Sequence, residues 1–304
     1  MTMNYALKKY VTEIALKTTL HLPSRFALPP TTSRFALEQL CKLFPQVKNV
    51  KIQPHSLAGI HAEEIKTVNA SKQIILHIHG GAFFLGSLNT HRAFMSEIAS
   101  KTQMRVIQMN YPLAPEAPYP EAFEAVCDAY QQLLNEGNNP KDIILSGDSC
   151  GANFALALAL KIKAEDPTQL PRALMLLSPF LDLTLTSESL RFNQKHDALL
   201  SIELLEMGMA YYLPDNIDRS LPQISPLFAD FTGLPPTLVQ VGSKEILLND
   251  ATRFEEKAKL AGVDVTYKLY TGMWHNFQMF SAWFDDAKQS IIDIADFAHQ
   301  VNQP

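Results

Sequence analysis

The pentapeptide Gly147-Asp148-Ser149-Cys150-Gly151 fits the pattern G-x-S-x-G and is the strongest chemical signal in the chain. It follows an apolar, β-branched run at residues 142–145 and precedes an alanine-rich run, so it lies at a predicted strand-to-helix turn. The two glycines leave room there for a serine in a strained backbone conformation. The start of the helix adds free N–H groups where an oxyanion would form. We therefore predict that Ser149 is a nucleophile.

A second motif, H-G-G-A at residues 79–82, also follows an apolar run. Adjacent glycines let backbone amides face a ligand without a Cβ in the way. A plain Gly-Gly turn would explain the glycines, but it would not explain their pairing with the serine turn. His79 and Asp148 are predicted to order this loop. The motif predicts an oxyanion hole whose donors are the amides of Gly80, Gly81 and Cys150.

A serine hydroxyl is a weak nucleophile at neutral pH, so the reaction needs a base. Among the nine histidines, His275 fits best because it follows the last predicted strand, residues 265–270. Loops at strand ends place side chains at the carboxyl edge of a sheet. His91 and His196 are predicted to lie at the surface or to order loops. With His275 as the base, activity is expected to fall below roughly pH 6.5.

The acid that orients the histidine is expected after the predicted strand at residues 237–241, where Glu245 and Asp250 compete. Glu245 lies in the loop itself. Asp250 falls in the first turn of the next helix, where a carboxylate caps the helix or offsets its dipole. Glu245 is the preferred acid, and Asp250 is the alternative.

Eight short runs rich in apolar and β-branched residues predict strands at residues 50–53, 64–68, 73–78, 105–109, 142–145, 173–177, 237–241 and 265–270. From residue 73 onward they alternate with helical patterns at residues 91–101, 122–135, 152–164, 249–260 and 282–299. This alternation predicts an α/β protein with a mostly parallel sheet flanked by helices, the first two or three strands being antiparallel. Residues 154–161 alternate Ala and Leu as a strand could, but their alanine content and position after a glycine favour a helix.

Two segments fall outside the alternation and predict a helical cap over the carboxyl edge of the sheet. Residues 1–43 have the pattern of helix, Pro-rich break and helix, and residues 182–215 combine a polar loop with a helix at 201–212. The predicted division is 1–43 for the N-terminal part of the cap and 44–304 for the catalytic domain, with a cap insertion at about 182–215.

Composition narrows the range of functions. The 304 residues are 47% hydrophobic and 19% charged, which excludes disordered and coiled-coil proteins. The formal charge of −5 and the lack of a dense basic run argue against nucleic acid as a partner. Cys41, Cys127 and Cys150 lack metal-ligand spacing, so neither a disulfide framework nor a zinc site is predicted.

Two further features concern location. Glu13 and Lys17 interrupt the apolar stretch near the N-terminus, where a signal peptide needs an unbroken apolar core. The longest apolar run, residues 154–160, is far short of the roughly 20 residues that span a bilayer. We expect a cytoplasmic protein without stable membrane insertion.

With these motifs assembled, the chain resembles the hormone-sensitive-lipase-like bacterial carboxylesterases of the α/β-hydrolase fold, from about residue 74 to residue 277. The resemblance is carried by the H-G-G-A loop, Y-P-L-A-P-E at residues 111–116, P-Y-P at 118–120, the serine pentapeptide, Ser178-Pro179 and G-M-W-H at 272–275. Three positions depart from the family pattern without removing an N–H donor, namely Ala82, Cys150 and Ala152. Pro112 stands where arginine is usual.

The resemblance implies a serine carboxylesterase that acts on small, short-acyl esters through an acyl-enzyme, with a triad of Ser149, Glu245 and His275. It implies no metal and no organic cofactor. By analogy with the family, a homodimer is one option for the assembly. Two alternatives stay open at this point: a catalytically inactive ligand-binding receptor or scaffold on the same fold, and a lactonase or peptidase that uses the same triad.

Overall fold

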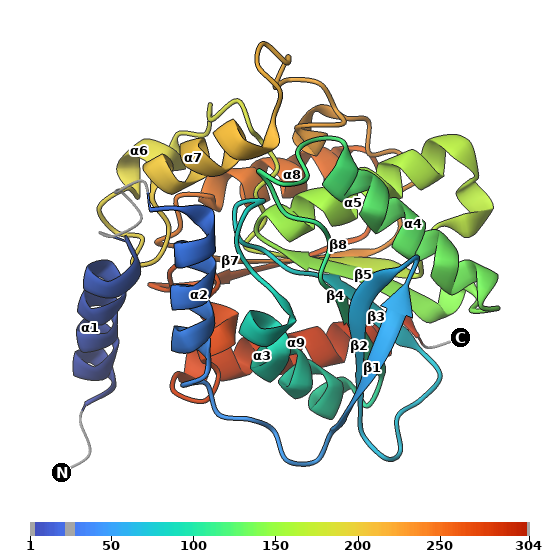
Figure 1. Ribbon diagram of the computed structural model, residues 1–304, viewed down its shortest axis with the longest axis horizontal. Helices are drawn as coiled ribbons and strands as arrows, with labels where there is room; N and C mark the ends of the chain where they lie inside the picture. The colour runs from blue at the N-terminus through green and yellow to red at the C-terminus, as the bar shows by residue number, and fades with distance from the viewer. Residues whose placement is uncertain (1–3, 22–27, 303–304) are drawn as a thin grey trace.

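The structure is a computed structural model that describes residues 4–21 and 28–302 (Figure 1). Its centre is an eight-stranded sheet in the order β1-β2-β4-β3-β5-β6-β7-β8. The strands are β1 (Lys51–Leu57), β2 (Ile60–Lys66), β3 (Ile74–Ile78), β4 (Arg105–Met109), β5 (Ile143–Asp148), β6 (Ala173–Leu177), β7 (Thr237–Gly242) and β8 (Val265–Tyr270). Strand β2 is antiparallel to β1 and to β4, and the other neighbours are parallel. The predicted sheet is confirmed.

The first hairpin is longer than predicted. Strands β1 and β2 pair along their whole length around a turn at Ala58 and Gly59, both of which have positive φ. Most of β1 is exposed and polar, so cross-strand hydrogen bonds rather than apolar burial define its ends. Strands β3, β5 and β6 are buried at every position, as expected of parallel strands covered on both faces.

Helices cover both faces of the sheet, as predicted (Figure 1). One face packs against α3 (Leu88–Thr102) and α9 (Asp285–Val301). The other packs against α4 (Glu121–Asn135), α5 (Cys150–Glu165) and α8 (Leu248–Leu260). Helix α5 contains the ambiguous residues 154–161 and is buried from Cys150 through Ala159. Because it has no solvent face over that stretch, its sequence shows no polar stripe at helical spacing.

The remaining helices come from the two segments outside the alternation. The N-terminal segment forms α1 (Tyr5–Leu16), the π-helix η1 (Lys17–His21) and α2 (Pro30–Cys41). The insertion after β6 forms α6 (Ser189–Phe192) and α7 (Ile202–Tyr212). Short 3₁₀ turns are η3 (Pro140–Asp142), η4 (Pro167–Gln169), η5 (Pro226–Phe228) and η6 (Phe277–Phe280). Figure 1 shows α1, α2, α6 and α7 gathered on one side of the molecule.

The predicted Pro-rich break between the first two helices falls largely on residues 22–27, which lie outside the described residues, as do 1–3 and 303–304 of the predicted segments. Within the described residues, every helix is too short or too polar to cross a membrane.

Candidate active site

Ser149 lies at a tight turn between the end of β5 and the start of α5, with φ 53° and ψ −124°. The turn leaves no room for a side chain two residues before or two residues after the serine. A Cβ on Gly147 would lie 2.3 Å from the carbonyl carbon of Gly151, and a Cβ on Gly151 would lie 2.0 Å from the carbonyl oxygen of Ile78. Only glycine fits these two positions, because Gly147 packs against the start of α5 and Gly151 packs against the end of β3.

His275 and Glu245 form a buried pair. His275 Nδ1 and Glu245 Oε2 are 3.0 Å apart, and the two loops that carry them follow β8 and β7. The other carboxylate oxygen, Oε1, accepts a hydrogen bond from the amide of Gly242 at 2.6 Å and one from Ser178 Oγ at 2.8 Å. The carboxylate is therefore fixed from three directions, with Oε2 directed at the imidazole.

The alternative acid, Asp250, lies elsewhere. Its carboxylate accepts hydrogen bonds from the amides of Leu181 and Asp182 and from the hydroxyl of Ser187. Burial raises the pKa of Asp250 to about 6. The structure thus places Glu245, and not Asp250, against His275.

The surroundings of His275 change the expected pH dependence. Burial lowers the pKa of His275, but the hydrogen bond and charge of Glu245, with the charges of Asp197 and Asp148, outweigh it and leave the pKa above its ordinary value of 6.5. Burial also raises the pKa of Glu245, against the hydrogen bond from His275. The expected loss of activity below roughly pH 6.5 must therefore begin at a higher pH.

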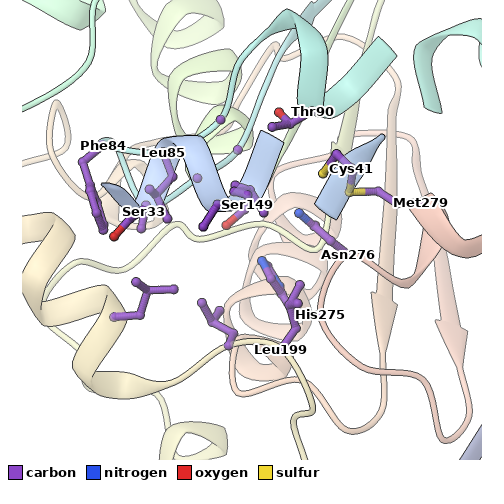
Figure 2. Close-up of a pocket in the computed structure, with 18 of the residues that line it drawn as sticks. Ser33, Cys41, Phe84, Leu85, Thr90, Ser149, Leu199, His275, Asn276 and Met279 are labelled. Atoms are coloured by element: carbon purple, nitrogen blue, oxygen red, sulfur yellow. The ribbon is translucent and has the colours of Figure 1, made fainter. Parts of the chain in front are cut away.

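Ser149 and His275 line one pocket (Figure 2). Among the described residues, no hydrogen bond joins Ser149 Oγ to the imidazole. Such bonds are often long without substrate and tighten when substrate binds. The geometry thus brings the serine to the same cavity as the His275–Glu245 pair.

The oxyanion loop, residues 79–85, differs from the prediction at one residue. The amide of Gly80 donates to Asp148 Oδ1 at 2.9 Å, so it is already engaged and is not free for an oxyanion. In the described part of the chain, no hydrogen bond engages the amide of Gly81. Among the residues that the structure describes, the amide of Ala82 has only the sulfur of Cys150 as a partner, and sulfur is a weak acceptor. The spacing of the motif could not show which glycine amide Asp148 would take.

Cys150 supplies the first N–H of helix α5, which has no partner within the helix. Its thiol is fully buried and accepts a hydrogen bond from the amide of Phe83 at 3.2 Å. Burial raises the pKa of this thiol to about 12. The side chain of Cys150 therefore links the start of α5 to the oxyanion loop. Its sulfur stays protonated as a thiol at neutral pH.

Asp148 is the centre of a buried network behind the oxyanion loop. Besides Gly80, its carboxylate contacts His77 Nε2 at 3.1 Å, His91 Nε2 at 3.3 Å and Asn276 Nδ2 at 2.6 Å. Burial raises the pKa of Asp148, but the charges and hydrogen bonds of His91 and His77 outweigh it and hold the pKa well below its ordinary value. The network joins the serine turn to the oxyanion loop and to the residue after His275.

The other candidate histidines differ in their burial and contacts. His79 stacks on Tyr111 at 4.4 Å between ring centroids, and burial lowers its pKa to about 3, so it stays neutral at physiological pH. His196 is exposed, as predicted. His91 is not at the surface, which was one of its two predicted options: it is 5% exposed, lines the pocket and contacts Asp148, as the other option, a loop-ordering role, requires. Nothing in the sequence around His91, which lies in α3, indicated its contact with Asp148.

One group of side chains has metal-ligand chemistry. Within residues 4–21 and 28–302, the ligand atoms of His77, His91 and Asp148 lie within 4.8 Å of one another. Both imidazoles direct Nε2 at the carboxylate, and their other ring nitrogens contact the hydroxyls of Ser146 and Thr90. Contacts with the carboxylate and with these two hydroxyls account for this arrangement, so we assign the group to loop ordering.

The pocket is small and mostly apolar. Its volume is about 200 Å³. In Figure 2, Phe84 and Leu85 lie on one side of Ser149, and Cys41 and Met279 lie on the other. Helices α2 and α7 contribute to the walls through Ser33, Ala36, Leu37, Cys41, Leu204 and Met207.

Sequence reasoning missed Asp197. It is fully buried in the insertion after β6, and its carboxylate accepts hydrogen bonds from the amides of His275 and Ile246. A single acid before the apolar residues 198–200 was the only sequence signal, and nothing in it indicated those partners.

Comparisons with known proteins agree with this geometry. Residues 75–279 match a family described as having the alpha/beta hydrolase fold. An esterase of Acinetobacter venetianus is 63% identical over 96% of both chains, and an acetyl-hydrolase of Streptomyces hygroscopicus is 34% identical over 76% of both. The crystal structure of an esterase from the bacterial hormone-sensitive lipase family superposes with a TM-score of 0.90 at 32% identity, covering 99% of this chain and 100% of that one.

Proposed function

The chain belongs to the α/β-hydrolase family and is a carboxylesterase related to the bacterial hormone-sensitive lipases, and on that premise we propose how it works and which esters it takes. Its proposed catalytic residues are Ser149, His275 and Glu245. Its proposed oxyanion donors are the amides of Gly81, Ala82 and Cys150.

In the proposed mechanism, Ser149 Oγ attacks the ester carbonyl carbon while His275 takes the hydroxyl proton. Glu245 holds the imidazole by its Nδ1–H and stabilises the imidazolium. The backbone amides stabilise the oxyanion of the tetrahedral intermediate. The imidazolium then gives its proton to the leaving alcohol, which leaves an acyl-enzyme. Water hydrolyses the acyl-enzyme by the same proton route.

The proposed substrates are small esters with short acyl chains. The imidazolium must reach the leaving oxygen, so the alcohol part of the bound ester is expected to lie on the side of the pocket near His275. The acyl group then occupies the side lined by Phe84 and Leu85. A cavity of about 200 Å³ is smaller than the roughly 300–1,000 Å³ common for ligand pockets. The similarity to an acetyl-hydrolase also favours a short acyl group.

We further propose that residues 1–43 and the insertion at about 182–215 form a cap over the rest of the catalytic domain, residues 44–304. The support is that α2 and α7, one from each segment, both line the pocket. The observation that carries the proposed triad is the 3.0 Å contact between His275 and Glu245 in a pocket shared with Ser149.

The test uses p-nitrophenyl esters of increasing chain length with the wild-type protein and Ser149→Ala. We expect Ser149→Ala to lose several orders of magnitude in kcat, and the wild-type protein to prefer the shortest chains. An organophosphate should label wild-type Ser149, as found by mass spectrometry, and should leave the variant unlabelled. Undiminished hydrolysis by Ser149→Ala would reject the nucleophile, and a long-chain optimum would reject the substrate class.

A further inference from the structure

The insertion after β6 holds the loop that carries the proposed acid. Ser189 Oγ donates a hydrogen bond to the carbonyl oxygen of Ile246 at 2.7 Å. Asn193 Nδ2 donates to the carbonyl oxygens of Glu245 at 2.8 Å and Ser243 at 3.0 Å. The backbone around Glu245 is thus fixed by polar side chains that do not belong to the sheet.

Asp197 extends this contact to the proposed base. Its Oδ2 accepts from the amide of Ile246 at 3.0 Å, and its Oδ1 accepts from the amide of His275 at 3.4 Å. Oδ1 also accepts from the amides of Leu199 at 3.1 Å and Leu200 at 3.2 Å. All four partners donate, so both oxygens act as acceptors, as those of an ionised carboxylate do.

We propose that Asp197 is a positioning residue that fixes the backbones of the base and the acid relative to each other, so that the insertion completes the His275–Glu245 pair. This inference rests on the triad proposed above. Leu199 and Leu200 line the pocket, so the same carboxylate also fixes part of the wall that faces the substrate.

The charge of Asp197 supports the proposed base in addition to its hydrogen bonds. The carboxylates that act on the imidazole are Glu245 from the loop after β7, Asp197 from the insertion and Asp148 from the serine turn. Each raises the pKa of His275. The ring becomes an imidazolium during acylation, and a fixed negative charge nearby stabilises it. Removing the charge of Asp197 should therefore make His275 harder to protonate.

The experiment compares two variants of the full chain. Asp197→Asn keeps the size and removes the charge. Asp197→Ser keeps a hydroxyl that can accept from the amides two and three residues later, but its side chain is too short for Ile246 and His275. We expect kcat for p-nitrophenyl acetate to fall by about 10- to 100-fold in both, with KM changed by less than about threefold. In Asp197→Asn the acidic limb of kcat/KM should move to lower pH.

Asp250→Asn is the matched control. Asp250 is 1% exposed, and its carboxylate likewise accepts from two backbone amides, those of Leu181 and Asp182. Among the described residues, its carboxylate makes no hydrogen bond to either loop of the proposed pair. Asp250→Asn should therefore leave the acidic limb at its wild-type pH, whatever it does to the unfolding temperature.

The outcomes separate this inference from the proposed function. Folded Asp197 variants with wild-type kcat and an unmoved acidic limb would overturn the positioning role while leaving the Ser149→Ala result intact. An equal shift of the limb in Asp250→Asn would also overturn it. If neither Asp197 variant folds, Asn193→Ala carries the test, because it breaks the contact with Glu245 and Ser243 without touching a charge. Wild-type kcat in that variant would overturn the inference.

Discussion

Gly208 lies inside helix α7, where the helix touches Ala82 of the oxyanion loop, and we expect Gly208→Ala to lower kcat by about 100-fold. A Cβ on Gly208 would lie 2.2 Å from the carbonyl oxygen of Ala82 and 2.9 Å from its Cβ. Ordinary contact begins near 3.4 Å, so helix and loop must separate by about 1.2 Å, the difference between 3.4 and 2.2 Å.

The loop cannot absorb this shift without moving its donors. Ala82 and Phe83 both have positive φ, at 49° and 68°, and the Phe83 ring stacks on Tyr212 of α7 at 4.3 Å between centroids. Displacing the amide of Ala82 would weaken one proposed oxyanion donor. Removal of one such donor in other enzymes costs roughly 10²- to 10³-fold in kcat, or about 2.7–4 kcal/mol. We take the lower end because the donor moves but stays present.

The assay measures kcat and KM for p-nitrophenyl acetate, with thermal unfolding and circular dichroism on the same samples. Alanine is a better helix former than glycine by about 1 kcal/mol, so α7 itself should not be weakened. The loss should appear in kcat more than in KM, because the oxyanion forms only in the transition state. Glu206→Ala, at an exposed position of the same helix, is the control and should keep wild-type kcat.

Wild-type kcat in a folded Gly208→Ala protein would contradict this prediction, because it would mean that Ala82 is not a donor or that the loop tolerates the displacement. An equal loss in Glu206→Ala would place the effect in the helix and not in its contact with the loop.

Two further predictions concern protonation. The acidic limb of kcat/KM should have its midpoint above 6.5, because the carboxylates around His275 raise its pKa and the base must be neutral to act; a midpoint below 6.5 would contradict this. Iodoacetamide at neutral pH should leave activity largely intact, because burial raises the pKa of Cys41, Cys127 and Cys150 to about 12. Rapid inactivation, with the modified cysteine identified by mass spectrometry, would show that a thiol is more reactive than its burial implies.

Much of the fold could be predicted because its signals are local. The central parallel strands are short buried runs, and the covering helices other than α5 repeat apolar residues on one face, so both periods can be found in the sequence. Strand β8, at the edge of the sheet, is only partly buried. The signal of the two glycines around Ser149 is equally local, because each is required by contacts within the turn or with the neighbouring strand. The first hairpin was less well predicted because its exposed strand depends on pairing more than on apolar pattern.

The candidate site could be predicted only in part. The order of serine, acid and histidine along the chain, with the strand before each, indicated which loops meet at the edge of the sheet. The loop position of Glu245 favoured it over Asp250, and the structure places Glu245 against His275. The H-G-G-A motif, however, assigned the amide of Gly80 to an oxyanion, although that amide donates to Asp148. These contacts join segments that lie 30 and 68 positions apart in the sequence, so the spacing of a motif does not fix them.

Short-range sterics and apolar periodicity are encoded along the chain, and they fix the sheet, the serine turn and the residue types available at the edge of the sheet. Which polar groups meet depends instead on how distant segments fold against one another. Asp197 reaches His275 across 78 positions, and Asp148 reaches Asn276 across 128. A hydrogen bond depends on the distance and angle between atoms in space, and the spacing of residues along the chain does not fix either one.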